Sequence, residues 1–392
     1  MKKLAIFLGI VLGLIMLVCV AIFALRKPLI KKLADGAILA IQKDIGREIS
    51  VEEYDISGMG ELQLRNVCIS QKPSFSNGTF LCAEAASFKP GTSKDGKTLN
   101  VSLELSRAEL NANEAGGHWD FDDLVALGDK SNDSGTEWEI GTVKITNSKA
   151  NIKSKSKNIQ SEIRDVDMTI KNTGTEISAE GKADIRIDTE NGTAHIPTIL
   201  DISTSFNEKD IHSAKGKITF NKASFGKITF DKFMLDADLE GITSPRESKN
   251  YSARFEASGI EIPADDTFIY EKVPEYLKLF AAAVGRPAPV IKDAEFHTIK
   301  GHLTVHNRSV GLSHFAIRSN FMETDGNISI NTKDRKSQSD MKISIGHNSI
   351  NLRIYGPIGK PEIEPVLAET ISKNLKKSYT DFEKSLLEYF PN

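Results

Sequence analysis

The feature that most constrains this 392-residue chain is a two-residue rhythm of apolar side chains. From about residue 48 onward, apolar residues occupy alternate positions in short runs, and polar residues fill the sites between them. A period of two is the period of a β-strand, and one apolar face per strand is typical of an antiparallel sheet with a single dry side. The sequence therefore predicts a mainly β protein.

The phase of this alternation changes at clusters of turn-forming residues. Two such clusters are Asn147-Ser148 and Asn172-Thr173-Gly174, and we expect a turn at each of them. A local repeat follows, in which the heptapeptide at 216–222 recurs ten residues later at 226–232 with one substitution. Both observations favour a long series of short strands joined in sequence order.

An uncharged stretch near the N-terminus predicts a transmembrane anchor. Leu4 to Leu25 is 22 residues long, is preceded by two lysines and is followed by Arg26 and Lys27. At 1.5 Å per residue it would span about 33 Å, enough to cross a hydrocarbon core of about 30 Å. The alternatives are a cleaved signal peptide and a lipoprotein site at Cys19, but the stretch is long and lacks a small-x-small cleavage pattern. We expect a single span with the body exported.

Three further segments show helical rather than strand periodicity, and they divide the chain. The predicted parts are a transmembrane anchor at 1–27, a juxtamembrane helix at 28–47, a β-rich region at 48–262, a helical insertion at 263–289, a second β-rich region at 290–358 and a C-terminal amphipathic helix at 359–392. We expect the last helix to pack over the sheet, with a membrane-surface or partner-docking role as the alternative.

The chain contains three cysteines, two of which fall in the β-rich region. Cys68 and Cys82 lie in alternating stretches on either side of an Asn77-Gly78 turn dipeptide. Such a pair can face each other across an antiparallel hairpin within bridging distance. Two buried free thiols are the alternative, and a bridge would indicate an oxidising compartment.

Composition and motifs give little support for nucleic-acid binding, a metal site or catalysis. The net charge of −3 gives the chain no electrostatic reason to bind nucleic acid. His302 and His306 are the best histidine pair, but four residues along a strand span about 13 Å, too far to share a metal. The run from Asp236 to Glu247 resembles a calcium loop in spacing, yet Glu240 and Pro245 depart from the pattern. We predict no enzyme activity, no metal and no cofactor.

Five segments, taken together and in order, resemble the AsmA family of bacterial envelope proteins. They are 45–51, 61–69, 116–124, 140–145 and 354–363, which match the family's Gly-Arg entry to a strand, its leucine-rich Asn-Val strand, its glycine–tryptophan–leucine corner, the strand that follows and its closing strand-Gly-Pro element. His118 stands where Asn is commoner in the third motif. The match is best over 1–170 and 340–365, so the middle of the chain rests on its strand pattern alone.

The resemblance implies an inner-membrane protein whose body lies in the periplasm. Its expected fold is an N-terminal transmembrane helix followed by an elongated, curled antiparallel sheet, a β-groove, with a few amphipathic helices. Its expected function is passive phospholipid transfer between membranes and a part in outer-membrane assembly or homeostasis. The candidate groove-lining residues are Val143, Ile145, Ile185, Ile187, Ile202, Phe220, Phe230, Leu303, Val305, Ile343, Ile345 and Leu352.

Two interpretations remain open at this point. Alternation alone does not distinguish a lipid-lined groove from an ordinary packed core, because both give one dry face per strand. In the first interpretation the partners are phospholipid acyl chains and the inner membrane. In the second, the protein is a non-enzymatic scaffold that docks envelope assembly partners through its C-terminal helix.

Overall fold

The structure is a computed structural model, and it divides into two compact units, unit 1 (Met1–Ile199) and unit 2 (Leu200–Asn392). It describes residues 38–39, 42–43, 45–56, 61–92, 99–122, 138–190, 192–207, 210–243, 249–263, 277–278, 281–282, 285, 287–291, 294–306, 308–365, 367 and 369–389. The mainly β class predicted from the alternation is confirmed. The boundary between the units falls inside the predicted 48–262 region, within the strand β10 (Gly192–Asn207).

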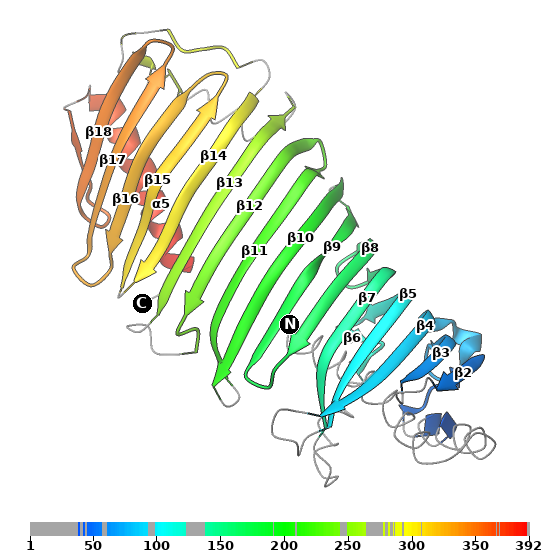
Figure 1. Cartoon of the computed structure of the whole chain (residues 1–392). Helices are drawn as coiled ribbons and strands as arrows, with labels where there is room; N and C mark the ends of the chain where they lie inside the picture. Colours follow the sequence, from blue (N-terminus) through cyan, green and yellow to red (C-terminus); the bar gives the residue numbers. More distant parts are fainter. Residues whose placement is uncertain are drawn as a thin grey trace. The chain divides into compact units, whose positions relative to one another are not determined.

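Unit 1 is built on consecutive strands, most of which pair with their neighbours in the sequence (Figure 1). These elements are β1 (Ile49–Ser50), β2 (Glu53–Ile56), β3 (Leu62–Ser70), the 3-10 turn η1 (Phe75–Asn77), β4 (Thr79–Thr92), β5 (Leu99–Ala115), β6 (His118–Trp119), β7 (Trp138–Ser154), β8 (Ile159–Asn172) and β9 (Glu176–Thr189). Ahead of them, residues 38–39, 42–43 and 45 are helical, in agreement with the predicted juxtamembrane helix. The helix ends at Gly46, whose φ of 64° is the left-handed conformation that glycine adopts most readily.

The purely antiparallel sheet that we predicted is wrong at one place in unit 1. β5 and β7 pair in parallel, with Leu103 opposite Val143 and Leu105 opposite Ile145. A parallel pair requires a crossover of about a dozen residues or more, and the chain between Ala115 and Trp138 is long enough to supply it. The sheet is therefore mixed rather than antiparallel. The prediction missed this because alternation of side chains does not reveal strand direction.

Unit 2 is an antiparallel series of strands followed by a long helix (Figure 1). Its elements are β11 (Asp210–Phe225), β12 (Ile228–Glu240), β13 (Asn250–Ile262), β14 (Ala294–His306), β15 (Ser309–Ser319), β16 (Glu323–Asn331), β17 (Lys336–Ile345), β18 (Asn348–Pro357), β19 (Glu362–Glu364) and the helix α5 (Glu369–Tyr389). The helix α5 lies within the range 359–392 predicted for the C-terminal helix, but the predicted start is wrong, because residues 362–364 form β19. In the predicted helical insertion, residues 277–278 and 281–282 are helical.

The two changes of phase in the sequence have different structural causes. At Asn172-Thr173-Gly174 the expected turn is confirmed: β8 ends there, and the Gly174 N–H donates to Asn172 Oδ1 at 2.9 Å. At Asn147-Ser148 the expected turn is wrong, because β7 runs straight through with Asn147 in the left-handed region (φ 49°). A left-handed residue inside a strand produces a bulge, which shifts the side-chain alternation by one position without ending the strand.

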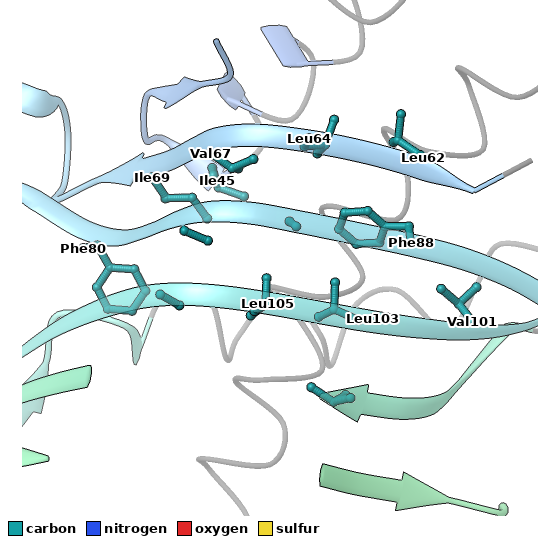
Figure 2. Packing of buried hydrophobic residues seen from close by; sticks show 14 of the residues in the cluster. Ile45, Leu62, Leu64, Val67, Ile69, Phe80, Phe88, Val101, Leu103 and Leu105 are labelled. Carbon is teal, nitrogen blue, oxygen red and sulfur yellow. The ribbon is translucent and has the colours of Figure 1, made fainter. Parts of the chain in front are cut away.

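The cores of both units lie on the apolar face of the sheet. In unit 1, side chains of β3, β4 and β5 form a buried cluster that includes Leu64, Phe88 and Leu103 (Figure 2), with Ile45 from the preceding helix packed in the same cluster. In unit 2, one buried cluster joins Leu277 and Ala281 to strand residues, and a second cluster lies beneath α5. Segments outside the strands therefore contribute to each core.

The predicted curl of the sheet is wrong, because the sheet is neither closed nor strongly curled. The buried clusters suggest why: Ile45, Leu277 and Leu375 of α5 pack against the strands, so the sheet does not have to fold over itself to bury these apolar side chains. The predicted anchor from Leu4 to Leu25, with Arg26 and Lys27, lies outside the described residues. Among those that are described, no helix is long and apolar enough to cross a membrane.

Candidate apolar binding face

In each unit, one face of the sheet is lined with ion pairs between neighbouring strands. In unit 1, Lys144 and Lys149 of β7 reach Glu104 and Glu109 of β5, each at 2.9 Å. In unit 2, the Lys215 amine of β11 lies 2.9 Å from the Asp238 carboxylate of β12. Because successive side chains in a strand point to opposite faces, these pairs place the apolar residues between them on the other face. In each unit, the sheet thus has one charged face and one apolar face.

In unit 1, the apolar face is buried over β3–β5 and half-buried over β8 and β9. Ile163 of β8 lies opposite Ile185 of β9, and Met168 lies opposite Gly181. Of the isoleucines and the methionine of β8 and β9, Ile170 packs against the unit 1 buried cluster, and the others lie outside the three buried clusters of the described residues. We define the unit 1 open face as Ile163, Met168, Ala179, Ile185 and Ile187, all half-buried.

In unit 2, the apolar side chains of β13 and β14 are buried toward one end of each strand and half-buried toward the other. Near one end of β13 and β14, Ala257, Ile260 and Phe296 are buried in the cluster that contains Leu277 and Ala281. Toward the other end, the apolar side chains are half-buried and lie outside the buried clusters of the described residues. We define the unit 2 open face by these residues, which are Ile218, Phe220, Leu235, Leu239, Tyr251, Phe255, Leu303 and Val305.

Aromatic rings and a glycine shape the unit 2 open face. The rings of Phe220 and Phe233 stack across β11 and β12 with centroids 5.5 Å apart. At Gly301, an added Cβ would lie 2.8 Å from the Phe255 ring and 2.9 Å from a Leu312 methyl group, so these two side chains occupy the space above the glycine. The absence of a side chain at Gly301 therefore lets the Phe255 ring lie close to the sheet.

The structure separates the twelve sequence-predicted lining residues into three groups. Val143, Ile343, Ile345 and Leu352 are buried in the packed clusters and line no open surface. Ile145 and Phe230 are half-buried and pack against those clusters. The remaining six are half-buried outside the clusters, namely Ile185, Ile187, Ile202, Phe220, Leu303 and Val305.

Several open-face residues are absent from the sequence-based list. Ile218, Leu235 and Phe255 are the clearest, because cross-strand register places Leu235 directly between the other two. Their alternation is visible in the sequence, so the signal was available. The pairing of strands, which brings residues from β11, β12 and β13 into one row, is not visible there.

The structure joins Cys68 of β3 to Cys82 of β4 in a disulfide. The two residues are direct cross-strand partners with a Cα–Cα distance of 4.1 Å and an S–S distance of 2.06 Å. Their neighbours Val67 and Ile69 are buried in the unit 1 core, so the disulfide lies on the opposite face. It links the two strands that carry much of the unit 1 core.

Buried polar groups in unit 1 support the fold next to the crossover. Glu114 of β5 accepts hydrogen bonds from the hydroxyls of Ser154 and Ser156, each at 2.6 Å, and these bonds lower its pKa to about 2. Burial raises the pKa of Asp120. The guanidinium of Arg47, buried at 2 % exposure, donates to the Asp120 carbonyl oxygen and lies 5.0 Å from the centre of the Phe80 ring. These contacts hold backbone segments together.

The metal-like patterns in the sequence are parts of strands. His302 of β14 has its Nε2 2.8 Å from Ser252 Oγ of β13, and His306 is exposed at the end of the same strand. Asp236, Asp238 and Glu240 belong to β12 rather than to a loop. Over the described ranges, no group of three His, Cys, Asp or Glu side chains is placed to hold a metal ion.

The helix α5 lies across β17 and β18 (Figure 1), and it buries both apolar and polar contacts. Leu375 packs on Ile343 and Leu352. One turn later, Tyr379 is buried, and burial together with the charge of Glu383 raises the pKa of this phenol to about 12.

Comparison of the sequence with protein-family models and with curated proteins gives no match. The open apolar face is therefore interpreted from its own geometry.

Proposed function

We propose that the protein is an inner-membrane-anchored envelope protein of the AsmA type that transfers phospholipid passively and contributes to outer-membrane assembly or homeostasis. The observation that carries this proposal is the half-buried apolar face, present over β8–β9 in unit 1 and over β11–β14 in unit 2. Large apolar side chains that remain partly exposed in a contiguous patch typically mark a binding surface. The charged opposite face keeps such a sheet soluble.

The physical chemistry of acyl chains fits such a surface. Removing a CH₂ group from water is worth about 0.8 kcal/mol, so even a few methylenes resting on the open face offset part of the cost of leaving the bilayer. Contact of this kind is non-directional, so a chain can slide along the face without a large barrier at any one residue. Transfer of this type needs no catalytic group.

The proposed location rests on separate observations. A disulfide between Cys68 and Cys82 persists in oxidising compartments such as the periplasm. The uncharged stretch from Leu4 to Leu25 has the length of a membrane span. Together with the five AsmA-like motifs, they support an anchor in the inner membrane and a body in the periplasm.

The direct test is lipid analysis of the full-length protein purified in a mild neutral detergent. We expect co-purified phospholipid, and we expect Ile185→Asp and Leu235→Asp to reduce it, because each places a carboxylate against acyl chains. Matched controls add the same charge to the opposite face of the same sheet: Ser178→Asp in β9 and Thr219→Asp in β11, both also half-buried. The controls should retain wild-type lipid.

Two results would contradict the proposal. One is a wild-type protein that carries no phospholipid above the amount found with an unrelated single-span protein. The other is an equal loss of lipid in the open-face variants and the matched controls, since that pattern would reflect general destabilisation. Circular dichroism of all four variants separates lost binding from lost folding.

The scaffold interpretation has a weaker physical basis. It assigned partner docking to the C-terminal helix, but the apolar side of α5 already packs on β17 and β18 through Leu375 and Tyr379. Among the described residues of α5, a partner would therefore have to recognise the exposed side of this helix, which is polar apart from Phe382 at 38 % exposure. Deleting 365–392 and finding unchanged lipid content with loss of a specific envelope partner would favour the scaffold.

A further inference from the structure

A cleft of about 550 Å³ lies between α5 and the segment that joins β18 to β19. The charged side chains that line it are Lys360, Lys376, Lys377 and Lys384, together with Glu362 and Asp381. Four cations against two anions give the lining side chains a formal charge of +2, and the Glu383 carboxylate in the cleft wall lowers the local total to +1, whereas the whole chain carries −3. Positive charge is thus concentrated at this place against the trend of the molecule.

The four cleft lysines differ from those of the charged sheet face. On that face, lysines such as Lys144, Lys149 and Lys215 lie within 3 Å of a carboxylate on the adjacent strand. By contrast, within the described part of the chain no ion pair involves any of the four cleft lysines. Their charges are therefore available to an external anion.

Neighbouring turns add to the positive potential. The Ile358 N–H donates to the Arg335 carbonyl at 2.9 Å, and Lys336 is the cross-strand partner of Pro357. These contacts place two further cationic residues beside the segment that forms one wall of the cleft, together with the acidic residue Asp334. Because such potentials sum over distances of about a Debye length, the turn strengthens attraction of an anion toward the cleft.

The walls of the cleft are held together by a buried carboxylate. Glu383 of α5 has no exposed surface, and it accepts hydrogen bonds from the Gly359 N–H at 2.9 Å and from the Ser337 hydroxyl. This residue therefore ties the helix both to the β18–β19 segment and to β17. The backbone positions that carry the lysines on the helix and on the segment are therefore held together without a ligand, which reduces the entropy lost on binding.

We propose that this cleft binds a phosphate ester. If the proposed function holds, on which this part of the inference rests, the ester is the headgroup of an anionic phospholipid. Lysine ammonium groups form charge-assisted hydrogen bonds with phosphate oxygens, and a small cleft with several of them suits a compact anion better than an extended acidic peptide. The cleft would then give the protein a preference for anionic over zwitterionic lipid.

The test compares lipids that differ only in headgroup. The full-length protein in neutral detergent receives equal amounts of phosphatidylglycerol and phosphatidylcholine with identical acyl chains, and native mass spectrometry counts the adducts. One variant replaces the four lysines by glutamine, and a second replaces them by arginine to keep the charge. The control variant replaces four exposed lysines outside the cleft by glutamine: Lys153, Lys217 and Lys300 in strands, and Lys157 in the turn between β7 and β8. A parallel calorimetric titration uses sn-glycerol 3-phosphate, which has the phosphate but no acyl chain.

We expect a preference of about tenfold for phosphatidylglycerol, lost in the glutamine variant and kept in the arginine and control variants. Binding of glycerol 3-phosphate that the glutamine variant loses would also support a phosphate-ester site, with a soluble source if the lipid preference is absent. An unchanged lipid ratio in the glutamine variant, without such phosphate binding, would overturn the proposal. So would tighter binding of a glutamate-rich peptide than of either phosphate compound.

The failure of this inference and of the proposed function are distinguishable. If the protein carries neither lipid, the lipid-transfer function fails, and the glycerol 3-phosphate titration alone decides the cleft. If both lipids bind equally well and glycerol 3-phosphate does not bind, the cleft proposal fails while lipid handling by the open face stands.

Discussion

Truncating two leucines of unit 2 should separate covered from open parts of the apolar face. Leu352 of β18 is 2 % exposed and packs with Ile343 and Leu375 beneath α5. Leu235 of β12 is half-buried and belongs to no buried cluster of the described residues. The two sites carry the same side chain in the same kind of strand. The difference between the two variants in lost free energy of unfolding therefore measures the effect of the α5 layer that covers Leu352 and is absent at Leu235.

The magnitudes follow from the two environments. Leu352→Ala removes a fully buried side chain and leaves a cavity that the strands and α5 fill incompletely, which costs about 3 kcal/mol of the free energy of unfolding. Leu235→Ala leaves no closed cavity, because water already reaches the site. Its cost is limited to partial loss of apolar contact, about 1 kcal/mol. We therefore expect a difference of about 2 kcal/mol between the variants.

Native-state hydrogen exchange measures this difference locally, which is necessary because the two units need not unfold together. Peptides from β17 and β18 should lose protection strongly in Leu352→Ala, and peptides from β12 and β13 should lose little in Leu235→Ala. Leu352→Met is the control, since it conserves volume and should cost less than about 1.5 kcal/mol. Equal losses in the two alanine variants would refute the distinction between a covered and an open face.

Three other results are expected. Cys82→Ala should lower the free energy of unfolding of unit 1 by about 3 kcal/mol, because the disulfide closes a loop with a sequence separation of 14, and denaturant titration of reduced wild type should give the same value. Wild type should have a higher free energy of unfolding than Glu114→Gln above pH 4.5, the ordinary pKa of this carboxyl, because the folded protein lowers its pKa to about 2. The difference should shrink as pH falls toward about 2. Unfolding midpoints measured from pH 7 to 2 would show this trend, and a pH-independent difference would contradict it. Tyr379→Phe should keep its stability at alkaline pH better than wild type. Wild type should lose stability as pH rises from 10 toward about 12, because burial favours the neutral phenol of Tyr379. If the phenol were instead solvated, the melting temperatures of the two proteins would follow parallel curves over that pH range.

Local chemistry explains which sequence-based expectations succeeded. The strand class and the turn at Asn172-Thr173-Gly174 follow from side-chain periodicity and from turn propensity, both of which act over a few residues. The same is true of the amphipathic α5. The misassigned turn at Asn147 shows the limit: a bulge and a turn change the phase of alternation in the same way, and cross-strand pairing decides between them.

Long-range pairing explains the other misses. The parallel alignment of β5 and β7 depends on how the chain between them crosses over, and alternation contains no information on strand direction. For the same reason, the sequence-based list placed Leu352 and Leu303 together as lining residues, although Leu352 is buried under α5 and Leu303 is half-buried on the open face.

The sequence by itself determined that this protein forms strands with one apolar side, because the two-residue period is a property of each strand alone. It also placed Cys68 and Cys82 in strands that could face each other. Only the tertiary structure decided which parts of the apolar side are covered, because covering depends on where Leu277, Ala281 and α5 pack after the strands have paired. It likewise brought the unpaired lysines of α5 beside the β18–β19 segment, since residues distant along the chain become neighbours only when the helix docks on the sheet.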